Sequence, residues 1–323
     1  MRFARRTLSA LAAHALTADW GTRILTTASS LYDPTHYNMG AVWPFVTGFV
    51  ALGHYQYARP WAGYPLVDAL SRMAFDWARG RHPELVSGAC YRPLDTAVPQ
   101  QFFATSMLAS SIGYGLLGWD PDAPAGRARL APQLPPQWDE VRVSGLRVGP
   151  ARLDVAIAQR PGRLSVRLEP RSGRLTVDLR PVPPPGARDV TLTLDGARVP
   201  KDAGGALAVA LDGRARTVEV RWTGGLAVES PVAALEPGQS DRGVRVLDFS
   251  ADARGWRLAL EGPADTTATV RLRGEAPASA EGATLVTAGA VTEATAAFPP
   301  AAGPFSRAEI LLRRGAAPAP LSP

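Results

Sequence analysis

The sequence is poor in residue types that several classes of protein need. It holds one cysteine, Cys90, which excludes an internal disulfide and argues against a structural zinc site. It holds one lysine, Lys201, among its 35 basic residues, which leaves 35 − 1 = 34 arginines. The four histidines lack a metal-ligand spacing with carboxylates, and no glycine-rich phosphate loop is present. We therefore expect neither a metal nor a cofactor.

Long hydrophobic runs and clusters of basic residues are also missing. The basic N-terminus is followed by a segment that His14, Thr17 and Asp19 interrupt, so it fits neither a secretory signal nor a membrane span. The net charge of +6 is carried by arginines spread along the whole chain, which resembles a compositional habit rather than a nucleic-acid-binding surface. We expect a cytoplasmic protein that binds neither membranes nor nucleic acid.

The chain changes character after Arg127. A length of 323 residues indicates two or three domains. Before that point, apolar residues at helical spacing predict helices over residues 2–18, 42–59, 61–79 and 99–117. Long loops over residues 19–34 and 80–98 separate some of them. The second and third helices are joined by a short link at Pro60 and should form an antiparallel hairpin.

Alternation of apolar and polar residues predicts strands beyond Arg127. The expected strands are 141–143, 153–157, 164–168, 175–179, 190–194 and 218–222, then 244–247, 256–260, 268–272 and 309–312. Residues 223–241 lack sustained periodicity and read as a linker, where limited proteolysis should cut early. The predicted fold class is α+β multidomain, with helices over 1–126, β-rich modules over 127–224 and 229–316, and a disordered tail over 317–323.

One short stretch, His36-Tyr-Asn-Met-Gly-Ala-Val-Trp-Pro44, concentrates polar and aromatic chemistry at the start of an apolar helix. Gly40 lets backbone approach a ligand closely, and Pro44 suits a first helical turn. Aromatic faces beside amide and imidazole groups suit a sugar, which offers C–H faces and hydroxyls. The candidate substrate-binding residues here are His36, Tyr37, Asn38 and Trp43. The alternative is an ordinary helix start with buried aromatic rings.

Several motifs in order carry a family resemblance. They are Tyr37-Asn-Met-Gly-Ala-Val-Trp-Pro44, Pro83-Glu-Leu-Val-Ser-Gly88, Pro99-Gln-Gln101 and the helix-to-strand junction around residues 131–149. Together they resemble the C-terminal part of six-hairpin, (α/α)6-barrel glycoside hydrolases, most of all the amylo-α-1,6-glucosidases of the glycogen-debranching group. The resemblance implies a partial barrel of about four helices followed by antiparallel β-sandwich-like modules. It departs at Phe45 and Val46, where relatives often carry polar residues.

Glu84 is the candidate catalytic residue. It is the only glutamate before Glu140, and by the resemblance it matches the general base of an inverting two-carboxylate mechanism. The resemblance places the general acid upstream of residue 1, so this chain alone should be inactive and should expose a large apolar patch. Its partners would be an α-glucan or oligosaccharide and an upstream half of the same barrel. The alternative is that Glu84 only caps a turn or pairs with Arg81 or Arg92.

Further residues of the two long loops could contact a sugar. Trp20 and Tyr91 are candidates for stacking, alongside Trp43. Gln100 and Gln101 could hold sugar hydroxyls or simply start a helix. Asp33 and Asp95 are more typical of a turn and a loop.

Two functions from different classes remain open. The first is the C-terminal portion of a glycoside hydrolase that cleaves α-glucosidic linkages, with a barrel hydrolase of other specificity, such as an α-L-rhamnosidase, as a variant. The second is a non-catalytic carbohydrate-binding or structural fragment of the same fold.

Overall fold

The computed structural model describes residues 2–202 and 204–315. Within them, the chain forms four α-helices followed by antiparallel sheets, which confirms an α+β fold. The helices are α1 (Arg2–Ala12), α2 (Pro44–Gln56), α3 (Pro60–Asp76) and α4 (Phe102–Ser110). The barrel and the domain boundaries stay predictions, and the tail expected over 317–323 lies outside the described residues.

The helices begin and end at different residues from those expected. Helix α1 stops at Ala12, because the chain turns there and β1 (Thr17–Ala18) pairs with β2 (Gly21–Thr22). Helix α2 starts at Pro44, after Trp43 in extended conformation. Pro60, which was expected in the link between the second and third helices, is the first residue of α3, where its missing N–H leaves no hydrogen bond unmade.

The last helix was expected to be one uniform segment and is not. Helix α4 continues as the π-helix η1 (Ser111–Leu116). Gly115 packs directly on Tyr55, since a Cβ there would lie 2.7 Å from the ring. A helix that is apolar on all sides is expected to be buried. Phe102 is nevertheless 81% exposed, and Tyr114 is 53% exposed. This helix therefore presents much of its apolar surface to solvent.

The first β-sandwich follows the helices. Its six-stranded sheet has the order β10-β9-β12-β7-β6-β5, and its four-stranded sheet has the order β11-β8-β4-β3. All pairings are antiparallel except β4 with β8. The strands are β3 (Asp120–Asp122), β4 (Arg127–Leu130), β5 (Glu140–Val148), β6 (Ala151–Arg160), β7 (Arg163–Ser172), β8 (Leu175–Leu179), β9 (Ala187–Leu194), β10 (Ala197–Val199), β11 (Leu207–Leu211) and β12 (Arg216–Gly224). The predicted strands are confirmed, and β3, β4, β10 and β11 were missed.

The second β-sandwich contains the sheets β13-β16-β19-β18 and β14-β15-β20-β17. Its strands are β13 (Leu226–Val228), β14 (Arg245–Ala251), β15 (Gly255–Pro263), β16 (Thr266–Gly274), β17 (Ser279–Glu281), β18 (Thr284–Ala288), β19 (Val291–Phe298) and β20 (Phe305–Arg313). The inward residues form one core that includes Phe249, Leu258 and Ile310. Strands β13, β17, β18 and β19 were not predicted.

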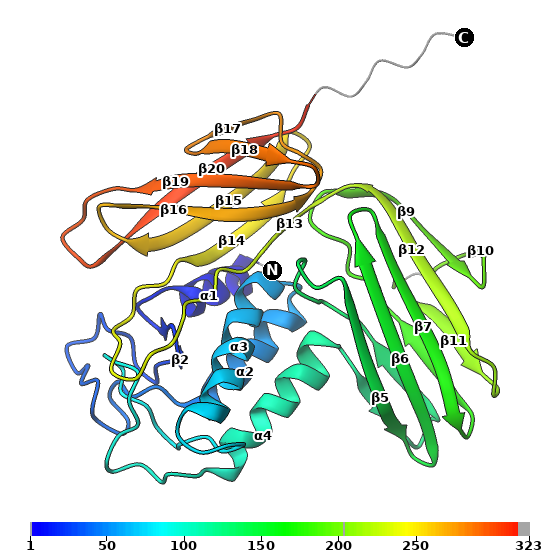
Figure 1. Cartoon of the computed structure of the whole chain (residues 1–323), viewed down its shortest axis with the longest axis horizontal. Coiled ribbons are helices and arrows are strands. Elements are labelled where there is room, and N and C mark those ends of the chain that lie inside the picture. The colour runs from blue at the N-terminus through cyan, green and yellow to red at the C-terminus, as the bar shows by residue number, and fades with distance from the viewer. Residues whose placement is uncertain (1, 203, 316–323) are drawn as a thin grey trace.

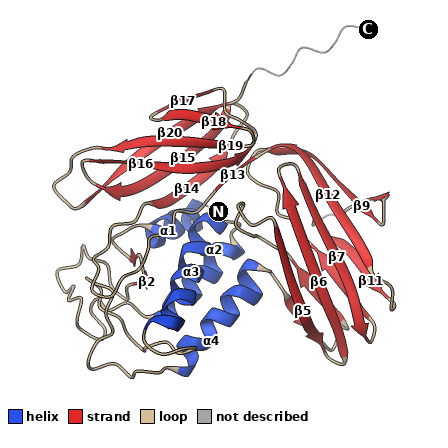
Figure 2. Ribbon diagram, viewed as in Figure 1, coloured by secondary structure: helices blue, strands red, loops and turns tan. Residues whose placement is uncertain are grey.

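The helices pack against both sandwiches, below the second and beside the first in the view of Figure 1, and contribute to both cores. Val50, Tyr55 and Leu66 of α2 and α3 pack with the core of the first sandwich. Trp61, at the start of α3, packs with the core of the second and meets Phe249 edge to face. Loops gather at one side of the helices, around β2 (Figure 2).

Residues 229–244, most of the expected linker, run back across these loops before β14 begins. The side chain of Asp241 is only 7% exposed, with its carboxylate 2.9 Å from His14 Nδ1 and 2.9 Å from Arg245 Nη2. Asp19 also accepts from Arg245, at 2.8 Å. Burial raises the pKa of Asp241, but Arg245, His14 and Arg23 together lower it well below its ordinary value. The absence of periodicity therefore marks a segment tied down by buried charges.

In the part of the chain that the structure describes, no helix combines the length and the hydrophobicity that crossing a membrane requires. The cytoplasmic location stays a prediction.

Candidate functional site

The two long loops of the helical region meet through one β-bridge. Val42 N–H donates to Val86 O at 2.8 Å, and Val86 N–H donates to Val42 O at 3.0 Å. Trp43 follows Val42 directly, and Glu84 lies two residues before Val86. This bridge therefore brings the glutamate of one loop beside the aromatic turn of the other.

Glu84 is 7% exposed and accepts hydrogen bonds from three groups. The Tyr37 hydroxyl donates to Oε1 at 2.5 Å, and Gln101 Nε2 donates to the same oxygen at 3.3 Å. Val98 N–H donates to Oε2 at 3.3 Å. Within the described residues, neither Arg81 nor Arg92 forms an ion pair with this carboxylate, and Arg92 instead lies 3.7 Å from Asp95.

Tyr37 links the carboxylate to Trp43. The rings of Tyr37 and Trp43 meet edge to face, with centroids 4.9 Å apart, and Trp43 Nε1 donates to Tyr37 O at 3.1 Å. The hydrogen bond to Glu84 raises the pKa of the Tyr37 hydroxyl above its ordinary value. Tyr37 is 39% exposed, so this pair forms a partly open aromatic rim beside a buried carboxylate.

Two helices start at this point. Trp43 is the N-cap residue of α2 and Gln101 is the N-cap residue of α4. Just inside them, Phe45 and Phe103 meet with centroids 4.7 Å apart, and Phe49 packs on Phe45. Sequence reasoning did not assign this phenylalanine cluster to the site, although the spacing of four between Phe45 and Phe49 puts both on one helix face.

The remaining polar candidates lie apart from Glu84. His36, Asn38 and Gln100 are exposed, and none of them hydrogen-bonds to the carboxylate. His36 Nδ1 instead accepts the backbone N–H of Asn38 at 3.2 Å, within their own turn. Asp33 accepts from Thr35 in the same turn, which is the structural role that its sequence suggested.

Two aromatic candidates lie in the core instead of the rim. Trp20 and Tyr91 are both 0% exposed and share one buried cluster with Val42 and Val86. Trp20 Nε1 donates to Ser87 O at 2.8 Å, and the Tyr91 hydroxyl donates to Asp76 at 2.6 Å. Because neither ring has a free face, their expected role in sugar stacking does not fit the structure. Loop sequence alone misled that prediction, since these loops are themselves packed.

Gly40 has a different role from the one expected. It is buried, and a Cβ there would lie 2.5 Å from Asp33 O and 2.7 Å from the Tyr32 ring. The close approach that glycine permits is thus between two parts of the loop, not between backbone and ligand.

The arrangement offers a buried carboxylate that accepts hydrogen bonds, an aromatic rim and an amide. Such a carboxylate can take a proton from a water molecule, and the rim can pack on an apolar sugar face. Among the described residues no second carboxylate contacts Glu84, and no cluster of three or more His, Cys, Asp or Glu could hold a metal.

No protein-family model matches the chain, and no curated protein sequence matches it. Among solved structures, the chain is similar to an α-L-rhamnosidase from Dictyoglumus thermophilum, at a TM-score of 0.37 and 10% identity over 58% of this chain and 21% of that one. It is also similar to a β-L-arabinofuranosidase from Geobacillus stearothermophilus, at a TM-score of 0.32 and 12% identity over 83% of this chain and 48% of that one. A third structure, described as a glycoside hydrolase, gives a TM-score of 0.31 and 11% identity over 85% of this chain and 52% of that one.

These neighbours bear the names of glycoside hydrolases, and neither of the two with a named activity is a debranching enzyme. The chain spans about a fifth of the first and about half of the other two. Scores this low do not establish a common fold, so the function is argued from the geometry around Glu84.

Proposed function

We propose that this chain is the base-carrying part of a glycoside hydrolase that acts on α-glucosidic linkages, with Glu84 as the general base. The observation that carries the proposal is the contact of Tyr37, Gln101 and Val98 N–H with one buried carboxylate beside Trp43. All three groups donate to the carboxylate, which keeps its oxygens fixed in direction. A fixed carboxylate next to an aromatic rim is what activation of water against a stacked sugar requires.

Inverting hydrolysis needs a second carboxylic acid on the opposite face of the sugar. We propose that polypeptide packing against the open face of α2 and α4 supplies it. Phe49, Phe102 and Ile112 lie on these helices and on η1 with 37% to 81% of their surface exposed. Exposed apolar side chains on neighbouring helices favour burial against a partner, and the upstream half of a six-hairpin barrel is the partner that the motif resemblance implies.

The test is hydrolysis of a panel of α-glucans by the native polypeptide that contains this chain. Glu84→Gln keeps the shape of the side chain and removes the base, so the rate should fall by roughly 10² to 10⁴ with little change in melting temperature. Asp95→Asn is the matched control, because Asp95 is an exposed carboxylate of the same loop. A Glu84→Gln enzyme with a near-normal rate would rule out the assignment.

A non-catalytic carbohydrate-binding fragment is the second candidate. It is favoured by one observation, that the described residues bring a single carboxylate to the site. In that case the native polypeptide would bind oligosaccharides without hydrolysing them, and Glu84→Gln would leave the affinity nearly unchanged. Trp43→Ala would weaken binding in either case, so it tests the location of the sugar and not the chemistry.

A further inference from the structure

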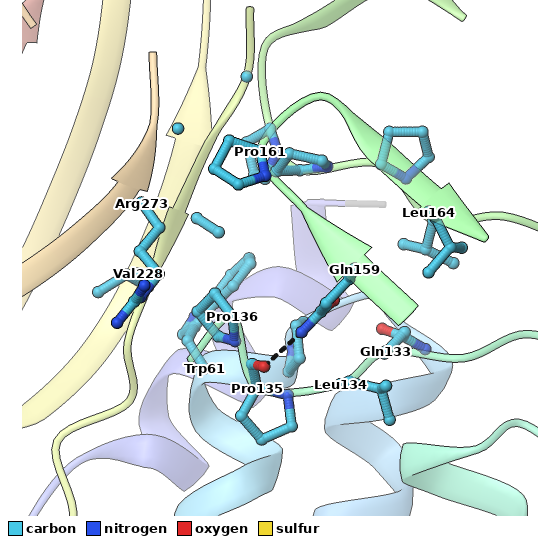
Figure 3. Close-up of a pocket in the computed structure, with 18 of the residues that line it drawn as sticks. Trp61, Gln133, Leu134, Pro135, Pro136, Gln159, Pro161, Leu164, Val228 and Arg273 are labelled. Carbon is cyan, nitrogen blue, oxygen red and sulfur yellow. Dashed lines mark hydrogen bonds between the residues drawn. The ribbon is translucent and has the colours of Figure 1, made fainter. Parts of the chain in front are cut away.

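A cavity of about 380 Å³ lies where the helices and the two sandwiches meet. Its walls come from the start of α3, the segment between β4 and β5, the turn between β6 and β7, the stretch before β9, and strands β13 and β16 (Figure 3). The volume is at the lower end of the roughly 300 to 1,000 Å³ that ligand pockets span, which suits a molecule of one or two sugar rings. Neither Glu84 nor any side chain that contacts it lines this cavity.

The two sites are at opposite ends of α2. Trp43 precedes its first residue, whereas Ala58 and Pro60 of the cavity follow its last. At 1.5 Å per residue, the helix separates them by about 20 Å. A ligand in the cavity is therefore distinct from a sugar beside Glu84.

The walls are rich in proline. Proline contributes repeatedly from four segments, and the lining prolines are Pro60, Pro132, Pro135, Pro136, Pro161, Pro181, Pro183, Pro184 and Pro185. A proline ring fixes its backbone angle, so these walls lose little freedom when a ligand binds. Proline also has a carbonyl oxygen but no N–H, which leaves a surface richer in hydrogen-bond acceptors than in backbone donors.

The charged groups of the lining are already paired. Arg160 lies 2.9 Å from Asp139, and Arg273 Nε donates to Glu229. Gln159 is also engaged, since its Nε2 donates to Pro135 O at 2.6 Å, as the dashed line in Figure 3 shows. A charged ligand would have to displace one of these ion pairs, so the cavity favours a neutral ligand.

Aromatic rings complete the lining. Trp61, Trp222 and Phe249 contribute to it, and Trp61 is 7% exposed. The indole N–H of Trp61 is buried without a hydrogen-bond partner among the described residues. Because this N–H is enclosed by protein, a ligand in the cavity would contact the ring of Trp61 and not its N–H.

We propose that this cavity binds a neutral saccharide of one or two rings, separately from the site at Glu84. Such a ligand has apolar C–H faces for the indole and proline rings. Its hydroxyls can donate to backbone carbonyl oxygens of the lining, and it carries no charge. The chemistry of the walls carries this inference, independently of the hydrolase proposal.

The experiment measures maltose and cellobiose binding to the full chain by calorimetry and by saturation-transfer NMR. Trp222→Ala removes a half-buried ring of the cavity and should weaken binding about five- to tenfold. Ala290→Trp adds a ring at an exposed lining position and should block the cavity without disturbing a core. Val286→Ser, at an exposed position of β18 outside both sites, is the control, and Trp43→Ala reports the contribution of the site at Glu84. Circular dichroism checks that each variant is folded.

Saccharide binding that Trp222→Ala and Ala290→Trp weaken, that Val286→Ser spares and that persists in Trp43→Ala would support the inference. Loss of that binding in Trp43→Ala alone would overturn it and leave the hydrolase proposal standing. Failure of both sugars to bind the folded wild type would overturn it as well. So would binding of a neutral apolar probe such as N-phenyl-1-naphthylamine in the cavity, blocked by Ala290→Trp, while neither sugar competes.

Discussion

Strand β19 of the second sandwich and helices α2 and α4 all carry many apolar residues, yet their large apolar side chains differ in exposure to solvent. Along β19 buried residues alternate with half-buried ones, and Phe298 is 2% exposed. On α2 and α4, Phe49 is 55% exposed and Phe102 is 81% exposed. Beyond Asp120 the large apolar side chains exposed among the described residues are only Val182, Val232 and Val286.

The difference shows that each sandwich closes its own core with its second sheet, whereas the helices close only the faces that touch the sandwiches. The helical face away from the sandwiches is open. The N-terminal ends of α2 and α4 lie beside Glu84, next to this open face. A surface that is apolar around a buried carboxylate fits a role in binding better than a role in stability.

Comparing alanine variants of Trp20 and Trp43 tests which aromatic residues belong to the core and which to the open face. Trp20→Ala removes a fully buried ring with a hydrogen bond to Ser87 O, so it should cost about 3 to 5 kcal/mol of unfolding free energy without a direct effect on a sugar. Trp43→Ala should cost less stability and lower the affinity for oligosaccharides. Chemical denaturation and calorimetry on both variants measure the two effects. Lost stability with intact affinity in Trp43→Ala would mean that Trp43 is core too.

The sequence predicted the elements better than their surroundings. Helical spacing located the four helices, and alternation located most strands, because both patterns depend on local periodicity. The motifs around Tyr37, Trp43, Glu84 and Gln101 identified residues that the structure brings together. Burial of Trp20 and Tyr91 depends instead on the bridge from Val42 to Val86, a contact between loops more than 40 residues apart in the sequence, which no local pattern reveals.

Replacing Asp241 tests whether the crossing segment is a linker or part of the packed structure. Asp241→Asn leaves Arg245 and His14 facing an uncharged amide in a buried site, which should cost about 3 to 5 kcal/mol. Limited proteolysis should then cut residues 229–244 early in the variant but not in the wild type. Asp265→Asn, at an exposed turn of the second sandwich, is the control. Rapid cleavage of the wild type there would restore the linker interpretation.

His54 tests the helical core through pH. Burial, followed by the charge of Arg59, lowers the pKa of His54 to about 3, and neither ring nitrogen has a hydrogen-bond partner among the described residues. The unfolded ring protonates below about pH 6.5 and the folded ring only near 3, so unfolding takes up a proton between these values. The stability linked to the neutral His54 ring is fully present above about pH 6.5 and is lost as the pH falls toward 3.

Between pH 6.5 and 5 the loss should be about 2 kcal/mol for the wild type. His54→Leu should remove that part of the pH dependence, because no group titrates at this position. Melting curves across this range make the measurement, and His36→Asn, at an exposed histidine, is the control. If the unfolding free energy fell equally steeply with pH in the wild type and in His54→Leu, the assignment of a neutral, buried His54 would be wrong.

The smallest effect on stability is expected at the open face itself. Phe49→Ser together with Phe102→Ser should change the unfolding free energy by only about 0.5 kcal/mol per site, because both rings are mostly in solvent. Binding of a hydrophobic dye and self-association should both fall. Val286→Ser, which is 67% exposed on β18, should change neither. Equal dye binding by the wild type and the double variant would mean that the helices expose no more dye-binding apolar surface than the sandwiches do.

The buried contact of His14 with Asp241 joins residues 227 positions apart. During synthesis, His14, Asp19 and Arg23 emerge long before their partner, and their charged or polar groups stay hydrated until residue 241 has left the ribosome. Closing so long a loop carries a large entropic cost, which slows any step that depends on it. The helices and the first sandwich can pack earlier, since their contacts lie closer in sequence. Docking of the second sandwich onto the helices is therefore the late step of folding, and the charge cluster forms with it.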